Sequence, residues 1–442
     1  MTEQFIQAVR ESWENREGNV NSTPEIFSWI RDLNANTCVR IEECSIDDCS
    51  SWLYDSEHGR IVSRSGKFFS ITGMRWKIDG ATVSEQPVII QPEIGYLGIL
   101  CAEIDGVLNF LMQAKIEPGN VNCVQLSPTI QATRSNFTRV HGGRAPTYLE
   151  LFSDPSRCTI IYDRIQSEQG SRFLRKRNRN IILRLNDDEV SSLEIHPNFR
   201  WMTLGQIKEL MREDNLVNMD TRTVLSGLPL EESGSYGYIG KIHRKLDDYR
   251  MYHDVITEEV PLTELPEWTV CGHGIDCSRP ADFMVRYYNI EIEGREVRKW
   301  DQPLFKAAGM ATFGLLCRDR EGRTEYLIRL KPEIGCFDMA EMGPTVQWEP
   351  THDATGDTEI DRLFREKASS KDGIITDVIL SEEGGRFYHE QNRNLIIKIK
   401  EEELPEIPDD YAWADLASLS RMIRSGGDLN IQLRNLVSLI DL

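Results

Sequence analysis

Polar and apolar residues alternate along the segment VQLSPTIQAT, residues 124–133. Gln, Ser and Thr occupy every second position, and the positions between them are Val, Leu, Pro, Ile and Ala. Because successive side chains of a strand point to opposite faces, this pattern predicts a half-buried antiparallel β-strand. The segment before it, NFLMQAKIEPGN, alternates in the same way and ends in a Pro-Gly-Asn turn. We therefore expect two neighbouring strands here.

Helical signals follow the strands in both halves of the chain. The segment LGQIKELMRE follows Thr203, which forms a capping box with Gln206. Asp415 stands at the matching cap position in the second half. Strands followed by a closing helix in each half predict an α+β fold with mixed or antiparallel sheets.

The two halves also repeat each other in sequence. LGILCAEIDG at 97–106 recurs as FGLLCRDREG at 313–322, and SEQGSRFLRKRNRN at 167–180 recurs as SEEGGRFYHEQNRN at 381–394. NFRWMTLGQI at 198–207 then recurs as DYAWADLASL at 410–419. The matches keep their order, and the spacing between partners hardly changes from one to the next. Such a pattern indicates a gene-duplicated protein.

The duplication sets the expected domain boundaries. We expect a first repeat over residues 1–228 and a second over residues 229–442. The region Pro229–Leu262, rich in Gly, Glu and Tyr, is the expected join. Two short helices, Gln4–Asn15 and Pro24–Asn34, are predicted before the first repeat.

Charge is unevenly placed in this chain of 442 residues. The formal net charge is −20, with 28% charged and 40% hydrophobic residues, a composition typical of soluble globular proteins. Such an acidic surface repels nucleic acid and anionic lipid, so an anionic ligand must be held by a local cationic patch. The expected patch comprises Arg172, Arg175, Lys176, Arg177 and Arg179.

Neither a membrane segment nor a metal site is expected. The first residues lack a basic and an apolar region, and the most apolar stretches are too short to span a bilayer, which predicts a cytoplasmic protein. The ten cysteines form no C-x-x-C pair and suit reduced thiols. The nearest grouping of metal ligands is CGHGIDC, with Cys271, His273, Asp276 and Cys277, and a turn with ordinary cysteines explains it equally well.

The polar side chains of the first repeat match the recognition of a sugar. They are amides, hydroxyls and a few ionisable groups, which bind hydroxyls and transfer protons: Gln113, Lys115, Glu117, Gln125, Ser127, Thr129, Gln131, Thr133, Asn136, Arg139 and His141. A solvated sheet face is the alternative interpretation. Beside a cationic patch, the same face fits a nucleotide-sugar, whose diphosphate accepts bidentate bonds from arginine.

The second repeat differs at several of these positions. Gly343 replaces Ser127, Glu349 replaces Thr133, and the sequence His-Glu-Gln at 389–391 replaces Arg175, Lys176 and Arg177. Carboxylates repel a diphosphate. We therefore expect that the second pocket has lost its ligand or changed its use.

Three long stretches resemble a known family. LMQAKIEPGNVNCVQLSPTIQATRSNFTRVHGG, QSEQGSRFLRKRNRN and FRWMTLGQ are similar to hallmark segments of the NDP-hexose 2,3-dehydratases. The resemblance covers both halves. It implies two Nudix-like domains, a homodimer, one productive pocket per subunit, no cofactor, and dTDP-4-keto-6-deoxyglucose as substrate. It also implies a downstream 3-ketoreductase that traps the product. The segment LIRLKPEIGCFDMAEMGPTVQWEP of the second repeat departs from the pattern.

The family's reaction suggests roles for individual residues. The C4 ketone acidifies the C3 proton, a base removes it, and the C2 hydroxyl leaves as water. Either Glu117 or His141 is the candidate base or acid, while Lys115 and the Gln131 amide steady oxyanions. Arg172, Arg175 and Arg177 are the candidate ligands of the diphosphate. Lys115 and Glu117 have the counterparts Lys331 and Glu333 in the second repeat. Because this pair persists in the repeat expected to be inactive, an ion pair without a catalytic role is the alternative interpretation.

Two other functions remain open at this point. A Nudix hydrolase would need the glutamate-rich pattern G-x₅-E-x₇-R-E-x₂-E-E, which neither repeat contains. A non-catalytic nucleotide-sugar sensor would bind the substrate without turnover.

Overall fold

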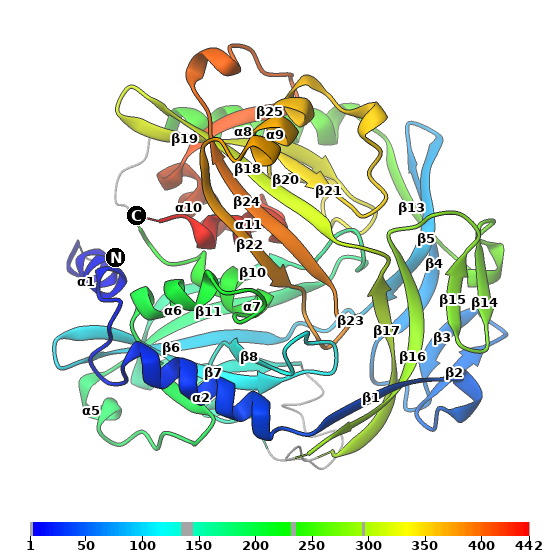
Figure 1. Ribbon diagram of the computed structural model, residues 1–442. Coiled ribbons are helices and arrows are strands. Elements are labelled where there is room, and N and C mark those ends of the chain that lie inside the picture. Colours follow the sequence, from blue (N-terminus) through cyan, green and yellow to red (C-terminus); the bar gives the residue numbers. More distant parts are fainter. Residues whose placement is uncertain (1–2, 134–144, 231–235, 294–296, 442) are drawn as a thin grey trace.

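The fold is a mixed α+β arrangement of several sheets that recurs along the chain. The computed structural model describes residues 3–133, 145–230, 236–293 and 297–441. In Figure 1 the sheet of the first repeat lies below that of the second, and two further sheets stand to the right of both. Both chain ends lie on the left-hand side. No helix in the described ranges is long and apolar enough to cross a membrane.

The main sheet of the first repeat has the order β10-β11-β6-β7-β12, with β8 paired to β7 and β9 to β6. β11 runs parallel to β6 and the other pairs are antiparallel. The strands are β6 Tyr96–Ile104, β7 Val107–Ile116, β8 Val124–Ser127, β9 Ile130–Ala132, β10 Cys158–Ser167, β11 Arg177–Leu185 and β12 Phe199–Met202.

The main sheet of the second repeat has the same topology. Its order is β20-β19-β18-β24-β22, with β21 on β18 and β25 on β19, and β24 is parallel to β18. The duplication inferred from sequence is therefore also present in the strand order. The strands are β18 Ala311–Arg320, β19 Arg323–Pro332, β20 Ala340–Gly343, β21 Val346–Trp348, β22 Ile374–Ser381, β24 Gln391–Lys398 and β25 Tyr411–Asp415.

Each repeat is closed by two helices where the sequence predicted one. The capping box of Thr203 and Gln206 and the cap at Asp415 are confirmed, since both cap side chains accept the expected backbone N–H. The join contains a long helix, α8. The predicted N-terminal helices are confirmed within two residues. The helices are α1 Glu3–Glu14, α2 Thr23–Asn36, α4 Leu149–Ser153, α5 Asp187–Val190, α6 Leu204–Met211, α7 Met219–Leu225, α8 Tyr236–Tyr252, α9 Glu359–Ser370, α10 Leu416–Ser425 and α11 Ile431–Leu439.

The repeats exchange strands in the two remaining sheets, which sequence analysis did not predict. β1, which precedes the first repeat's sheets, pairs with β16 of the second repeat, and β13 of the second repeat pairs with β4 of the first. These strands are β1 Val39–Cys44, β2 Trp52–Asp55, β3 Arg60–Ser63, β4 Ser70–Ile78, β5 Ala81–Ile90, β13 Val255–Val260, β14 Trp268–Cys271, β15 Gly274–Cys277, β16 Phe283–Ile292, β17 Lys299–Ala307 and β23 Phe387–Tyr388.

The expected single strand over residues 124–133 is instead two strands, and its polar face is not solvated. The chain leaves β7 at Ser127 and joins β6 at Ile130. Between them, the Thr129 hydroxyl accepts from Leu100 N at 2.9 Å and donates to the carbonyl of Leu111, which ties β6 to β7. The prediction of a half-buried strand was wrong because neighbouring segments cover both faces of this ribbon.

One hydrophobic core passes through both repeats. Phe110 and Leu210 of the first repeat belong to the same buried cluster as Phe313 and Leu433 of the second. α6, α7, α10 and α11 lie between the two main sheets (Figure 1), and α7 packs on α11. Burial of apolar area contributes about 25 cal/mol per Å², so this shared core couples the stability of the two repeats.

Two fully buried arginines cross between the repeats inside this core. Arg222 of α7 donates to the carbonyl of Ser381 at 2.6 Å, and Arg434 of α11 donates to the carbonyl of Ser167. Buried cations are costly unless hydrogen-bonded, so each helix is fixed to the strand end of the other repeat.

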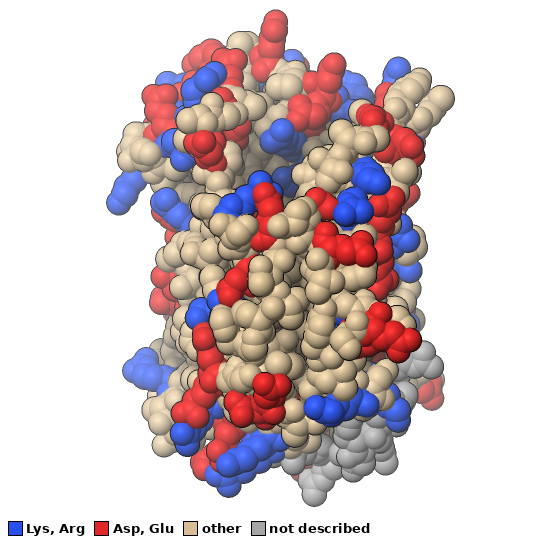
Figure 2. Space-filling view, turned by 90° about the vertical axis from the view of Figure 1, so that its right-hand side faces the viewer, with Lys and Arg blue, Asp and Glu red and all other residues tan. Residues whose placement is uncertain are grey.

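The surface charge is mixed. Figure 2 views the right-hand side of Figure 1, where Lys and Arg are mixed with Asp and Glu around a largely uncharged centre. A large cationic surface is therefore not seen among the described residues on this side.

A loop of each repeat docks on a glycine turn of the other. Gly119 N donates to Gly384 O at 2.7 Å, and a Cβ at Gly119 would lie 1.6 Å from the carbonyl oxygen of Phe387. Gly335 stands in the same relation to Gly170 and Phe173, with N···O also 2.7 Å.

We expect Gly119→Ala to lower the free energy of unfolding by about 1–3 kcal/mol, because the methyl group displaces backbone that cannot rotate away. Urea denaturation measures this change. Gly240→Ala is the control, since no atom lies within 4 Å of a Cβ at that exposed helix position. Equal stability of the two variants would contradict the close packing described here.

We also expect separately expressed fragments 1–228 and 229–442 to fold only together. Each fragment alone leaves β4 or β16 without the strand that the other repeat supplies, and unpaired edges aggregate. Size-exclusion chromatography and circular dichroism of the separate and mixed fragments measure this. A single fragment that unfolds cooperatively as a monomer would refute it.

Candidate functional site

A chain of hydrogen bonds joins three strands and a helix of the first repeat. Lys115 Nζ and Gln131 Nε2 both donate to Oε1 of Glu117, at 2.9 and 3.0 Å. Ser127 donates to Gln131 Oε1 at 2.9 Å, and Asn218 Nδ2 donates to Ser127 Oγ at 2.9 Å. We call these five residues the first-repeat network. Sequence analysis predicted four of them, and the structure brings those four together.

Further carboxyl groups surround this network. Asp220 of α7 is buried, and Glu117, Glu168 and Glu383 act on its charge. Burial raises the pKa of Asp220 well above its usual range, raises the pKa of Glu168, and raises the pKa of Glu383 to about 7. A carboxyl group whose pKa is raised keeps its proton to higher pH and can act as an acid.

Sequence reasoning missed these groups for different reasons. Asp220 aligns with Gln432 once NFRWMTLGQI is placed on DYAWADLASL. Comparison of the two closing helices would therefore have shown a carboxylate present in one repeat alone. Glu383 belongs to the second repeat and reaches the first through the docked loop, so no sequence signal places it there.

The other predicted strand residues have structural partners. Gln125 Nε2 donates to Ser381 Oγ at 2.6 Å across the repeats, and Thr129 ties β6 to β7 as described. Gln113 is half-buried on β7, opposite Ser127. Thr133 directly follows β9. Asn136, Arg139 and His141 lie outside the described residues.

The predicted cationic patch is divided in space. Arg172 is buried, lies 3.1 Å from Glu349 Oε2 and stacks on Phe283. Lys176 is buried and donates to the carbonyl of Glu93, whereas Arg175 is exposed. The expectation of one patch was wrong, because neighbouring residues of this tight loop leave it in different directions.

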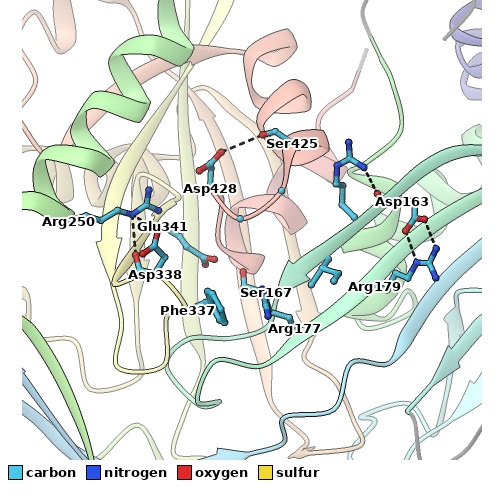
Figure 3. Close-up of a pocket in the computed structure, with 14 residues that line it drawn as sticks. Asp163, Ser167, Arg177, Arg179, Arg250, Phe337, Asp338, Glu341, Ser425 and Asp428 are labelled. Atoms are coloured by element: carbon cyan, nitrogen blue, oxygen red, sulfur yellow. Dashed lines mark hydrogen bonds and ion pairs between the residues drawn. The ribbon is translucent and has the colours of Figure 1, made fainter. Parts of the chain in front are cut away.

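Arg177 lines a cavity of about 720 Å³ between the repeats. Its guanidinium lies 3.8 Å from the ring centroid of Phe337, and Figure 3 shows the two side chains together at the floor of the cavity. Most other charges here are paired, including Arg179 with Asp163. The remaining lining residues include Arg164, Ser167, Arg250, Asp338, Glu341, Ser425, Gly426, Gly427 and Asp428.

The cavity depends on two glycines of the second repeat. Gly426 and Gly427 correspond to Asp214 and Asn215 of the first repeat. On that side, Asp214 accepts from Ile379 N at 2.9 Å and Asn215 donates to Gln391 Oε1 at 2.8 Å. These two side chains occupy the space that the glycines leave open.

The inner part of the network persists in the second repeat. Gln347 Nε2 donates to Glu333 Oε1 at 2.8 Å, and Asn430 donates to Gln347 at 3.1 Å. Gly343 and Gln432 replace Ser127 and Asp220. The repeats therefore differ in the groups around the Glu–Gln–Asn arrangement rather than in the arrangement itself.

One set of metal-ligating atoms was found in the described ranges. The ligand atoms of Cys271, His273 and Asp276 lie within 4.8 Å of one another on the β14–β15 hairpin. His273 Nε2 is 3.0 Å from Asp276 Oδ2, while Arg286 binds the other carboxylate oxygen. These groups already form a closed hydrogen-bonded turn, and they lie in a different sheet from the network.

Comparison with known proteins agrees with the earlier resemblance. Residues 23–228 and 240–440 each match the family model described as NDP-hexose 2,3-dehydratase. Three relatives carry the name dTDP-4-dehydro-6-deoxy-alpha-D-glucopyranose 2,3-dehydratase. The protein of Streptomyces violaceoruber is 35% identical over 95% of this chain and 97% of its own. Those of Saccharopolyspora spinosa and Amycolatopsis orientalis are 35% and 36% identical, over 94% and 95% of this chain and 90% of each relative. The chain belongs to the NDP-hexose 2,3-dehydratase family.

Proposed function

We propose that this protein is a hydro-lyase that removes the C2 hydroxyl of dTDP-4-keto-6-deoxyglucose in deoxysugar biosynthesis. The names of its relatives support the substrate and the reaction. The observation that carries the proposal is the first-repeat network. It holds one carboxylate between two donors, next to Asp220, whose pKa burial raises well above its usual range.

The chemistry requires several proton transfers and no net oxidation. The base takes the C3 proton, which the C4 ketone acidifies, and the electron pair forms an enolate. The C2–O bond then breaks, and an acid supplies the proton with which the hydroxyl leaves as water. The resulting enol gains a proton at C2 and loses the proton of its C3 hydroxyl, which gives the 3,4-diketone. Positioned acids and bases contribute typically about 10²–10⁴-fold to such steps.

The network offers groups for each role. Two donors fix the orientation of the Glu117 carboxylate. A base needs such a fixed orientation because it must face one particular C–H bond. Asp220 is the proposed acid for the departing hydroxyl. Lys115 and the Gln131 amide are the proposed donors to the enolate oxygen, where fixed dipoles act most strongly. His141 remains an alternative acid or base.

The second repeat is proposed to be a remnant. Gln432 cannot supply the proton that Asp220 can, and Gly343 lacks the hydroxyl of Ser127. Glu390 is also buried there, where the first repeat has Lys176. These substitutions remove an acid and a cation, and both losses are unfavourable for the proposed reaction of a diphosphate ester.

The resemblance supports further features of the proposal. We propose Nudix-like folds for both repeats, with boundaries near residues 228 and 229, and a cytoplasmic homodimer. The repeated α+β sheet with closing helices is compatible with such a fold. The 3,4-diketone product is reactive, so a 3-ketoreductase is the proposed partner that reduces it.

We expect Glu117→Gln to lower kcat at least about 100-fold, since an amide cannot take the C3 proton. The matched variant Glu333→Gln should leave kcat close to that of the parent. The assay incubates each variant with dTDP-4-keto-6-deoxyglucose in D₂O, with and without a ketoreductase, and follows loss of the C2 hydroxyl.

Other outcomes of this assay identify other functions. Equal losses in the two variants would refute the assignment to the first repeat. Saturable binding of unchanged sugar by the parent would indicate a sensor, and release of dTMP would indicate a hydrolase. Deuterium at C3 without loss of the C2 hydroxyl would indicate an epimerase.

Burial of Glu390 in the second repeat predicts that the stability of the protein depends on pH. Burial raises the pKa of Glu390 from 4.5 to about 8. Between these values the folded protein keeps a proton that the unfolded chain has lost, so stability falls as pH rises, by up to about 1.4 kcal/mol per pH unit. Glu390→Gln should therefore reduce the loss of stability between about pH 5 and pH 8, as measured by urea denaturation. An unchanged pH profile would show that Glu390 is not the group responsible.

A further inference from the structure

The docked loops carry one arginine of each repeat to the other. Arg172 and Arg386 occupy equivalent positions in the segments that start at Ser167 and Ser381. Gly170 and Gly384 anchor their loops to Gly335 and Gly119, each through an N···O contact of 2.7 Å. Arg172 of the first repeat therefore lies beside residues of the second repeat. Arg386 of the second repeat lies beside residues of the first, next to the turn that follows Glu117.

The charge of Arg172 is neutralised where it lies. Its side chain is 3% exposed, and Glu349 Oε2 is 3.1 Å away. Glu390 and Asp282 also act on it electrostatically. Because the charge of this guanidinium is already compensated by its neighbours, it attracts an anionic ligand only weakly.

Arg386 has different neighbours. It is half-buried, donates to the amide oxygen of Gln91 at 3.2 Å and stacks on Phe69 at 4.3 Å. Within the described residues no carboxylate lies within the ion-pair distance of 4.0 Å of its guanidinium, and Glu383 acts on it electrostatically from farther away. Where Arg172 meets Glu349 and Glu390, the equivalent first-repeat positions are Thr133 and Lys176.

Lys176 adds a second cation on the same side. Its ammonium donates to the backbone carbonyl of Glu93, and Gln91, the partner of Arg386, lies two residues earlier in the same segment. Lys176 and Arg386 also act on each other electrostatically, as do Lys176 and the carboxyl groups of Glu93, Glu168 and Glu383. Burial raises the pKa of Glu168 and of Glu383, so these two groups oppose an anionic ligand less than ordinary carboxylates would.

We propose that Arg386 and Lys176 bind the diphosphate of the sugar nucleotide, so that the second repeat completes the first-repeat site. This inference rests on the proposed function. Two cations match a group that carries about two negative charges, and the planar guanidinium can bind it with two hydrogen bonds. Glu383 links the two parts of the site, since it lies in the loop of Arg386 and interacts with Glu117 and Lys115 of the network. A sugar seated on the network then has its diphosphate beside Arg386.

Binding of dTDP, measured by isothermal titration calorimetry, tests the proposal. Arg386→Ala should weaken binding at least about tenfold, as loss of a charge-assisted pair does. Arg386→Lys should recover part of the affinity, because it keeps the charge and loses the bidentate geometry. Arg244→Ala is the charge-matched control on the surface of α8, where the side chain is 83% exposed, and it should bind dTDP as the parent does.

A repeat-exchange variant tests the same idea without removing the arginine. Thr133→Glu places in the first repeat the carboxylate that neutralises Arg172 in the second. It should pair with Arg386 and weaken dTDP binding as Arg386→Ala does. Circular dichroism of each variant monitors folding, and Arg386→Gln replaces Arg386→Ala should the alanine variant unfold.

The possible results separate this inference from the proposed function. Unchanged dTDP affinity in Arg386→Ala and Thr133→Glu, with a parent that dehydrates the keto sugar, would overturn the inference alone. Loss of affinity in Arg177→Ala instead would place the nucleotide in the cavity and also overturn it. A parent that neither binds dTDP nor dehydrates the keto sugar would overturn both.

Discussion

Reciprocal exchange between the repeats is the constraint on which this structure depends. β1 and β13 each complete a sheet of the other repeat, and Arg222 and Arg434 each bond a strand end of the other repeat from within the shared core. The loops at Gly170 and Gly384 also contact the other repeat, each through a backbone hydrogen bond next to the polar residues of that repeat. Because backbone groups must be paired when buried, none of these contacts can be released without cost. The relative position of the repeats therefore follows from hydrogen bonding as well as from apolar burial.

Within this symmetric frame, the two repeats differ at a few side chains. Both repeats hold a glutamate through a glutamine and an asparagine, so this arrangement alone does not select a site. Ser127 and Asp220 occur on one side, where Gly343 and Gln432 stand on the other. Their charges also differ, since among the described residues an ion pair with a glutamate holds Arg172 but not Arg386. A symmetric backbone can thus carry two sites that differ in charge and in hydrogen-bonding groups.

The sequence predicts those features that depend on neighbours along the chain. The duplication follows from comparison of two segments. Spacing within a segment predicts the helix caps at Thr203 and Asp415, and it also groups Lys115, Glu117 and Gln131. Features that depend on partners far along the chain were missed. Strand exchange pairs Gly73 with Val260, and the cationic loop divides because its side chains meet different repeats. Periodicity contains no information on either.

Strand exchange also bears on how such a protein evolves. After a duplication, an inactive copy is ordinarily free to accumulate mutations or to be deleted. Here the second repeat supplies an edge strand, a buried guanidinium and a docking loop to the first. Purifying selection should therefore preserve the scaffold of the second repeat even where the residues of its pocket change. Deletion of either half of the gene should prevent the remaining half from folding.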